Sequence, residues 1–237
     1  PQNRSYELPR AETPAAIAER TDWRPENWVV LGGSGFIGSE MVKHLQKAGH
    51  TVVSISAPRL KLTENKRTPG DVAVLAEGVE AEKLEQLFRG ADVVVNAAGV
   101  AKPVGDADDS LYGANALLPT VIAVAARNSG VPRVIHLSSA AVQGSRKTLD
   151  SSTEVAPFSP YSHSKALGEL ALIQLSTTLQ DTDLVIVRAT SVQGVNRDTT
   201  RMLKRIARSP LSSVAFPGTQ PTVVSSVDGL CEFVEYI

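Results

Sequence analysis

Seven residues constrain the fold of this chain more than any others: Gly32-Gly33-Ser34-Gly35-Phe36-Ile37-Gly38. They directly follow the apolar run 28–31 and precede a stretch with helical periodicity. A buried strand that turns tightly into a helix directs unpaired backbone N–H groups and the positive end of the helix dipole at one point. The pattern therefore predicts a phosphate-binding loop, in which Gly32, Gly35 and Gly38 permit the turn, the close approach of phosphate oxygens and helix packing. A purely structural turn is the alternative that glycine spacing alone leaves open.

From Trp28 onward short apolar runs alternate with helical patterns, which is typical of an α/β fold with a doubly wound parallel sheet, the Rossmann architecture. The strands we expect are Trp28–Leu31, Thr51–Ile55, Val72–Leu75, Asp92–Asn96, Arg133–Leu137 and Leu184–Arg188. Helical periodicity follows the glycine loop and recurs in 84–88, 111–125 and 200–208, after which a loop rich in Ser and Pro leads to 227–236.

Three segments are expected along the chain. Residues 1–27 form an N-terminal extension, with one short helix that starts at Thr13 and Pro14. Residues 28–194 form the Rossmann domain, and residues 195–237 form a partial substrate-side segment that makes a small, short C-terminal cap.

The composition excludes several classes of protein. With 237 residues and 42% hydrophobic content the chain can bury a sizeable core, and 24 basic against 25 acidic residues give no field for nucleic acid or an anionic membrane. Cys231 is the only cysteine, which fits a reducing compartment, and no apolar stretch approaches the roughly 20 residues that span a bilayer. We therefore expect a cytoplasmic protein whose partner is a small-molecule substrate.

Metal and ATP chemistry are not indicated. The four histidines, His44, His50, His136 and His163, have no metal-ligand spacing, and His163 is expected to be an exposed helical residue. The glycine loop lacks the Gly-Lys-Ser/Thr ending of an ATP-binding loop, which counts against a kinase or ATPase.

Tyr161 and Lys165 are spaced to lie on one helix face, one turn apart. A phenol serves as an acid or base at neutral pH only if a nearby positive charge stabilises its phenolate, and Lys165 is placed to do that. Ser138 and Ser139 end a predicted strand at the carboxyl edge of the sheet, where open α/β folds bind ligands. They could hold a substrate oxygen or merely terminate the strand through local hydrogen bonds.

These motifs together resemble the extended branch of the short-chain dehydrogenase/reductase family, which includes NAD(P)-dependent nucleotide-sugar epimerases, dehydratases and reductases. The resemblance runs from about residue 28 to the C-terminus. It rests on the glycine loop, Asn96-Ala97-Ala98-Gly99, Tyr112-Gly113-Ala114-Asn115, Ser138-Ser139 and the Tyr161 to Lys165 pair, all in the family's order.

The resemblance implies specific roles. Tyr161 would be the general acid/base, Lys165 would hold the nicotinamide ribose and lower the tyrosine pKa, Ser139 would position the reacting oxygen, and Asn115 would support a proton-relay water. The cofactor would contact Gly32, Gly35, Phe36, Ile37, Gly38, Ala97, Ala98 and Gly99.

The residues that follow the second predicted strand are the first departure from the family's usual pattern. Where an NAD-binding member has an acidic residue after the second strand, this chain has Ser56, followed by Arg59 and Lys61. Ser56 and Arg59 could receive a 2′-phosphate, so NADP(H) is favoured and NAD(H) is the alternative. The other interpretation of Arg59 is a solvated charge on a loop, without a role in binding. Glu77 falls where the family places an acidic residue near the adenine.

Residues on the expected substrate side also differ from the family's usual pattern. Ala140 and Ala141 follow Ser139 where dehydratases place an acid pair, which favours epimerisation or reduction over dehydration. Gln143 and Gln193 replace tyrosines, and Ser191 replaces an asparagine that often contacts the substrate diphosphate.

Two functions remain open at this point. The first is an NAD(P)-dependent oxidoreductase or epimerase that acts on a carbonyl or secondary alcohol, plausibly of a nucleotide sugar. The second is a dinucleotide-binding regulator or interaction protein that has lost turnover. By analogy with the family, a homodimer would form through the helices that carry Asn115 and Tyr161.

Overall fold

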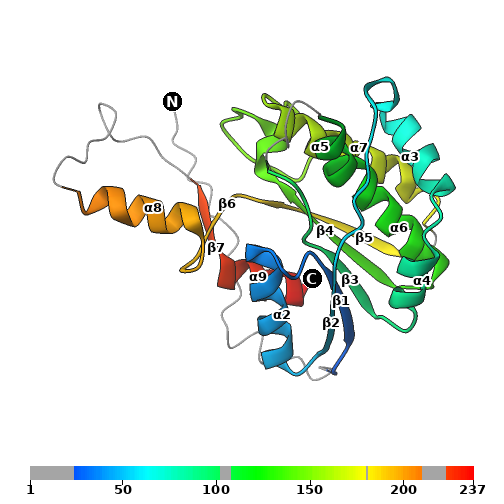
Figure 1. Ribbon diagram of the computed structural model, residues 1–237, viewed down its shortest axis with the longest axis horizontal. Coiled ribbons are helices and arrows are strands. Elements are labelled where there is room, and N and C mark those ends of the chain that lie inside the picture. Colours follow the sequence, from blue (N-terminus) through cyan, green and yellow to red (C-terminus); the bar gives the residue numbers. More distant parts are fainter. Residues whose placement is uncertain (1–23, 102–107, 180, 210–222) are drawn as a thin grey trace, which may run out of the picture.

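Five parallel strands form the central sheet, in the spatial order β2-β1-β3-β4-β5 (Figure 1). The computed structural model describes residues 24–101, 108–179, 181–209 and 223–237. The strands are β1 Asn27–Leu31, β2 Thr51–Ile55, β3 Val93–Asn96, β4 Arg133–Ser139 and β5 Asp183–Ala189. The predicted doubly wound Rossmann architecture is thereby confirmed, and five of the six predicted strands lie within a residue or two of their expected bounds.

Helices cover both faces of the sheet. On one face lie α2 (Phe36–Ala48) and α9 (Val227–Tyr236), and on the other lie α3 (Pro69–Gly78), α4 (Glu82–Phe88), α6 (Leu118–Asn128) and α7 (Pro160–Ser176) (Figure 1). Alternate strand residues serve the two layers: Trp28 and Val30 pack toward α2 and α9, while Val29 and Leu31 pack toward α6 and α7. Because both faces are covered, the strands are apolar without alternation.

Short elements connect these layers. They are the 3-10 turns η1 (Glu64–Lys66) and η3 (Ala140–Gln143), the helix α5 (Asp108–Tyr112), and the π-helical turn η2 (Gly113–Leu117), which joins α5 to α6. A π-turn inside a helix often marks a functional position. Here it carries Asn115.

The predicted strand Val72–Leu75 is wrong, because these residues lie inside α3. Thr68 caps this helix by accepting a hydrogen bond from the Asp71 backbone N–H at 3.1 Å, and Pro69 occupies the first helical position. Val72 and Ala76, one turn apart, are fully buried, whereas Val74 is 74% exposed. The burial follows a helical period rather than that of a strand in a covered sheet.

Helix α3 packs on α6 and α7, where Gly70 approaches Gln174 and Glu77 pairs with Arg127. Part of the surface of the two helices expected to mediate a dimer is therefore covered by α3, and dimerisation stays a prediction. Among the described strands none pairs with the outer side of β2, so β2 is an edge strand.

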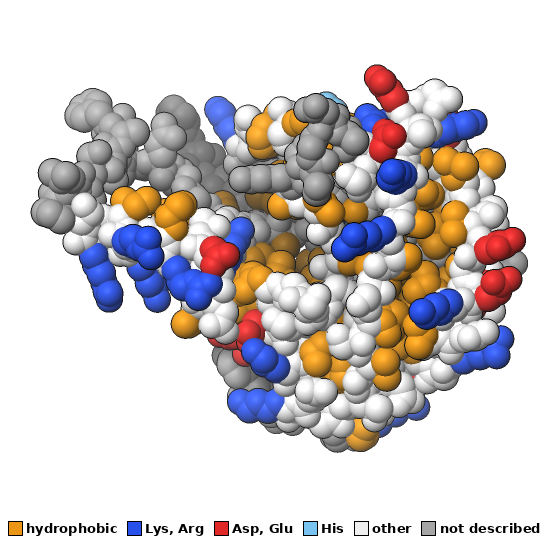
Figure 2. Space-filling model, in the orientation of Figure 1, with side chains coloured by type: hydrophobic (Ala, Val, Ile, Leu, Met, Phe, Trp, Pro, Cys, Tyr) orange, Lys and Arg blue, Asp and Glu red, His pale blue; other side chains and the backbone are white. Residues whose placement is uncertain are grey.

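The C-terminal part joins both a small sheet and the main core. β6 (Ser191–Gln193) pairs in parallel with β7 (Val224–Ser226). Helix α8 (Asp198–Ala207) projects from the body (Figure 1) and carries basic side chains (Figure 2). Helix α9 packs on α2, with Leu230, Cys231 and Val234 in the core. The boundaries at 27 and 194 stay predictions, and the helix expected at Thr13 lies outside the described residues.

Candidate active site

The glycine loop has the geometry of a phosphate cradle. Gly32 adopts a φ of +80°, and a Cβ there would lie 2.8 Å from the backbone of Ala98. A Cβ on Gly38 would collide with the Gly32 carbonyl. The first helical hydrogen bond of α2 runs from the Ser39 N–H to the Gly35 carbonyl at 2.9 Å, so the preceding N–H groups of 36–38 have no partner within the helix. A pyrophosphate fits such a set of donors.

Gly99 connects this loop to the catalytic candidates. A Cβ on Gly99 would lie 3.0 Å from Asn115 Oδ1 and 3.2 Å from Lys165 Nζ. Asn115 is fully buried; its amide donates to the Val100 carbonyl at 2.8 Å and accepts from the Val100 N–H at 3.0 Å. It also donates to Ser164 Oγ at 3.0 Å. Asn115 thus fixes the chain after β3 against α7.

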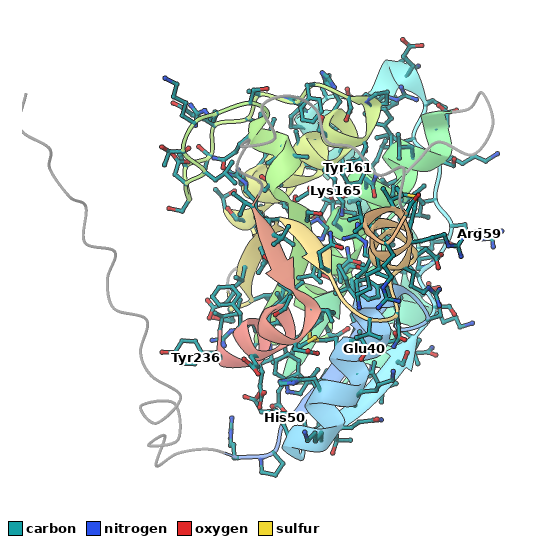
Figure 3. The ribbon with its side chains drawn as sticks, turned by 90° about the vertical axis from the view of Figure 1, so that its left-hand side faces the viewer. Glu40, His50, Arg59, Tyr161, Lys165 and Tyr236 are labelled. Atoms are coloured by element: carbon teal, nitrogen blue, oxygen red, sulfur yellow. The ribbon has the colours of Figure 1, made fainter. Side chains whose placement is uncertain are left out.

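Lys165 is buried beneath this junction. Its Nζ donates a hydrogen bond to the Leu137 carbonyl at 3.0 Å, and the side chain comes from the second turn of α7 (Figure 3). Burial lowers the pKa of Lys165 to about 8, and the nearby Glu169 carboxylate opposes that fall. The ammonium is still the major form at neutral pH.

Tyr161 lies beside Lys165 on the same helix (Figure 3). Partial burial raises the pKa of its phenol, while a hydrogen bond with Ser139 and the positive charge of Arg197 oppose the rise. Ser139 ends β4 and caps the following turn by accepting from the Ala141 N–H at 3.2 Å. The structure therefore brings Ser139, Tyr161, Lys165 and Asn115 to one place at the carboxyl edge of the sheet, and the cation that acts on Tyr161 there is Arg197.

His136 is a buried residue at this site that the sequence interpretation passed over. Asn96 Oδ1 accepts from the Ala98 N–H at 3.1 Å, so the amide nitrogen of Asn96 faces His136 Nδ1, at 3.1 Å. Nδ1 is then the acceptor and Nε2 carries the proton. Burial and the charge of Lys165 hold the pKa of His136 well below its ordinary value, so the ring is neutral. Its Nε2 has no partner among the described residues.

A buried ion pair lies one turn beyond Lys165. Glu169, 1% exposed, accepts from Arg188 Nε at 3.0 Å and from Nη2 at 2.7 Å. Arg188 Nη1 also donates to the Ser152 carbonyl at 2.7 Å. Arg188 thereby connects β5, α7 and the loop that follows β4. The i+4 spacing of Lys165 and Glu169 could have suggested that Glu169 lies near the site, but no local pattern indicates Arg188 as its partner.

The same loop is held by Gln143. Gln143 is 1% exposed; its amide donates to Asp150 Oδ1 at 2.8 Å and accepts from the Asp150 N–H at 3.2 Å. The glutamine that replaces the family's usual tyrosine is therefore buried against this loop.

The predicted cofactor residues outside the glycine loop differ in their positions. Ser56 directly follows Ile55, whose carbonyl accepts from the Gly32 N–H at 3.1 Å. Ser56 and Arg59 follow β2 and are exposed, with Arg59 at the edge of the molecule (Figure 3). Glu77 instead forms a bidentate pair with Arg127, 2.8 Å for each hydrogen bond. Arg127 ends α6 near the start of β4, at the edge of the sheet opposite the glycine loop, so the structure does not bring Glu77 to the cofactor side.

The histidines and the cysteine are the remaining residues that the sequence singled out. Among the described residues no group of three or more His, Cys, Asp or Glu side chains could hold a metal ion. His163 is exposed and its Nδ1 lies 2.8 Å from the Ser159 carbonyl, as expected for a helical surface histidine. The Cys231 thiol is buried, and burial raises its pKa to about 12.

Comparison with known proteins decides the family. The model of the NAD dependent epimerase/dehydratase family matches residues 28–234, most of the chain. The chain belongs to this family. The predicted resemblance to the extended short-chain dehydrogenases/reductases is thereby confirmed.

The sequence identity between this chain and individual members of the family is low. The UDP-glucose 4-epimerase of Mycolicibacterium smegmatis is 31% identical over 185 residues, which are 72% of this chain and 57% of that protein. The dTDP-glucose 4,6-dehydratase of Streptomyces niveus is 28% identical over 184 residues, 70% of this chain and 54% of that protein. The chain thus spans little more than half the length of these relatives.

A solved structure shows the same fold. The UDP-glucuronic acid 4-epimerase of Bacillus cereus, in complex with UDP-glucuronic acid and NAD, superposes with a TM-score of 0.66 at 20% identity, over 88% of this chain and 72% of that chain. Among the described residues of the present chain no helix is long and apolar enough to span a membrane.

Proposed function

We propose that this member of the epimerase/dehydratase family binds NAD(P) at the glycine loop and catalyses hydride transfer at a carbonyl or secondary alcohol of a nucleotide sugar. The observation that carries the proposal is that Tyr161 is paired with Ser139 while Lys165, one turn further along the same helix, lies beside Gly99. Gly99 follows Ala98, whose backbone contacts Gly32 of the phosphate cradle. Residues 28–194 supply the cofactor site, and residues 195–237 are part of the substrate side.

Tyr161 moves the proton in this proposal. Its phenol hydrogen-bonds with Ser139, so a substrate oxygen between the two hydroxyls would be held and protonated or deprotonated by Tyr161. The bound nicotinamide would supply or accept the hydride. Lys165 holds the ribose and keeps a positive charge beneath the site, since its pKa of about 8 leaves it mainly protonated at pH 7.

The cofactor's other end would lie beyond β2. A cavity of about 230 Å³ opens there between Ser56, Leu60 and Leu84 and is lined mainly by apolar side chains. An adenine ring suits such a cavity. We propose that Ser56 and Arg59 then receive a 2′-phosphate, which favours NADP(H) over NAD(H).

Epimerisation or reduction is proposed rather than dehydration. The turn η3 after Ser139 begins with Ala140 and Ala141, which place no carboxyl group beside the reacting carbon. Removal of water from a sugar needs an acid that protonates the leaving hydroxyl, and this turn does not supply one.

Turnover tests the proposal. The purified chain would be incubated with NADP⁺ or NAD⁺ and UDP-glucose, UDP-glucuronic acid or dTDP-glucose, and followed by reduced-nicotinamide absorbance and by chromatography of the sugars. Tyr161→Phe should retain cofactor affinity and lose turnover by about 100-fold or more. Tyr236→Phe, which changes an exposed tyrosine on α9, is the matched control.

Two outcomes contradict the proposal. Cofactor binding without turnover on any of the sugars would favour a dinucleotide-binding regulator on the same fold. If the chain binds neither NAD⁺ nor NADP⁺ in a calorimetric titration, the proposal is wrong.

A further inference from the structure

Arg197 has an unusual position for a basic residue outside the catalytic set. It precedes α8, its backbone N–H donates to the Gly194 carbonyl at 3.1 Å, and it caps that helix in an extended conformation. A Cβ on Gly194 would lie 2.8 Å from the ring of Phe36, the first residue of α2. The turn 194–197 is thus packed directly against the start of the glycine-loop helix.

The guanidinium is close to two parts of the candidate site. Its carbon is 5.9 Å from the centre of the Phe36 ring, and its charge is one of the influences that lower the pKa of Tyr161. Arg197 therefore lies beside the start of the glycine-loop helix and near enough to Tyr161 for its charge to act on the phenol, although it comes from the predicted substrate-side segment.

Among the described residues Arg197 has no anionic partner. It forms no ion pair with any described residue, whereas the nearby Arg201 pairs with Asp198. Its Nη1 is buried and finds no hydrogen-bond acceptor among the residues that the structure describes. A buried guanidinium nitrogen without an acceptor is costly, so its partner is expected to be a ligand.

We propose that Arg197 is an anion-binding residue of the active site, whose guanidinium takes a pair of carboxylate or phosphate oxygens from the bound ligand between Phe36 and Tyr161. The planar fork of arginine matches such an oxygen pair. The inference rests on the proposed function for the identity of the ligand, which is either an acidic nucleotide sugar with its carboxylate or the diphosphate of a dinucleotide or nucleotide sugar.

Calorimetric titration distinguishes these sources. The probes are NAD⁺ alone, and UDP-glucose or UDP-glucuronic acid added to chain saturated with NAD⁺. Variants are Arg197→Gln, Arg197→Lys, which keeps the charge without the fork, and Arg201→Gln as the matched control on the same helix. Urea unfolding verifies that each variant is folded.

Arg197→Gln is expected to weaken binding by about 10- to 100-fold, since charge-assisted hydrogen bonds are lost, with Arg197→Lys intermediate and Arg201→Gln unchanged. A loss confined to UDP-glucuronic acid assigns the site to a sugar carboxylate. A loss for NAD⁺, or for both sugars alike, assigns it to a diphosphate.

Unchanged affinities for all three probes in Arg197→Gln would overturn the proposal, as would an equal loss in Arg201→Gln or a wild-type chain that binds none of them. Failure of the two proposals can be told apart. Arg197-dependent binding without turnover would remove the proposed function and leave the anion site in place.

Discussion

Glu169 and Arg188 form an ion pair between α7 and β5, one helical turn beyond Lys165, in which one carboxylate oxygen accepts from Arg188 Nε at 3.0 Å and from Nη2 at 2.7 Å. The carboxylate is 1% exposed, so removal of its charge leaves the guanidinium without a counter-charge in a poorly solvated place. The pair therefore serves both the stability of the fold and the electrostatics of Lys165.

Glu169→Gln should destabilise the chain by about 3 kcal/mol, the scale found when one partner of a buried ion pair is removed. Glu77→Gln is the matched control, because its pair with Arg127 is 41% exposed at the carboxylate and should cost about 1 kcal/mol or less. Urea unfolding at pH 7 measures both. Equal losses of unfolding free energy in the two variants would show that burial does not make the Glu169 pair more stabilising than the exposed pair.

Gly38→Ala should damage both the fold and the cradle. The added methyl would collide with the Gly32 carbonyl, a backbone atom that cannot rotate away, so we expect a loss of about 1–3 kcal/mol and a large loss of dinucleotide affinity. Gly78→Ala is the control, since no atom lies within 4 Å of its Cβ position. Unfolding and cofactor titration check the pair of variants; a Gly38→Ala chain with wild-type affinity contradicts the cradle geometry.

The pKa of Lys165 predicts a specific pH dependence of stability. Its folded pKa of about 8 lies below the ordinary 10.5, so between these values the unfolded chain binds more protons and stability rises with pH. Lys165→Met removes this contribution and should be more stable than wild type at pH 7, with the difference shrinking by up to about 3 kcal/mol toward pH 10.5.

The wild type and Lys165→Met have to be compared at each pH, because Cys231 changes the free energy of unfolding with pH in the opposite direction. Its raised pKa means that the folded thiol retains its proton above pH 9, and stability falls there as pH rises. Both chains contain Cys231, so the difference in unfolding free energy isolates Lys165. A difference that does not change between pH 8 and 10 would contradict the buried position of the ammonium.

The sheet could be predicted because its strands are buried on both faces and read as short apolar runs. Leu31, Asn96 and Ser139 end strands whose pairing brings their carboxyl ends to one edge, and this placed Gly32, Gly99 and Tyr161 correctly in one region. Val72–Leu75 is a short apolar run of the same kind, and the strand prediction took no account of Thr68-Pro69, which cap a helix in the structure. Local composition does not separate a short buried helix from a strand.

The second group of site residues could not be predicted because their roles arise from tertiary contacts. Arg188 and Glu169 are 19 positions apart, and neither belongs to a motif with its own chemistry. His136 acquires its tautomer from Asn96, which is 40 residues earlier, and Arg197 acquires its surroundings from Phe36. The sequence identifies which groups can react, and the packing decides which of them interact.

Ser56 and Arg59 carry the last prediction, the preference for NADP⁺ over NAD⁺. No carboxylate stands after β2 to repel a 2′-phosphate or to bind the ribose 2′-hydroxyl. Arg59→Ala should weaken NADP⁺ binding by about tenfold or more and leave NAD⁺ binding unchanged, and Ser56→Asp should reverse the preference. Arg89→Ala, an exposed arginine just before β3 at the opposite edge of the sheet, is the control. Fluorescence titration with the two reduced cofactors measures the ratio; a wild-type chain that prefers NADH, with no response to Arg59→Ala, would assign Arg59 to the solvated surface.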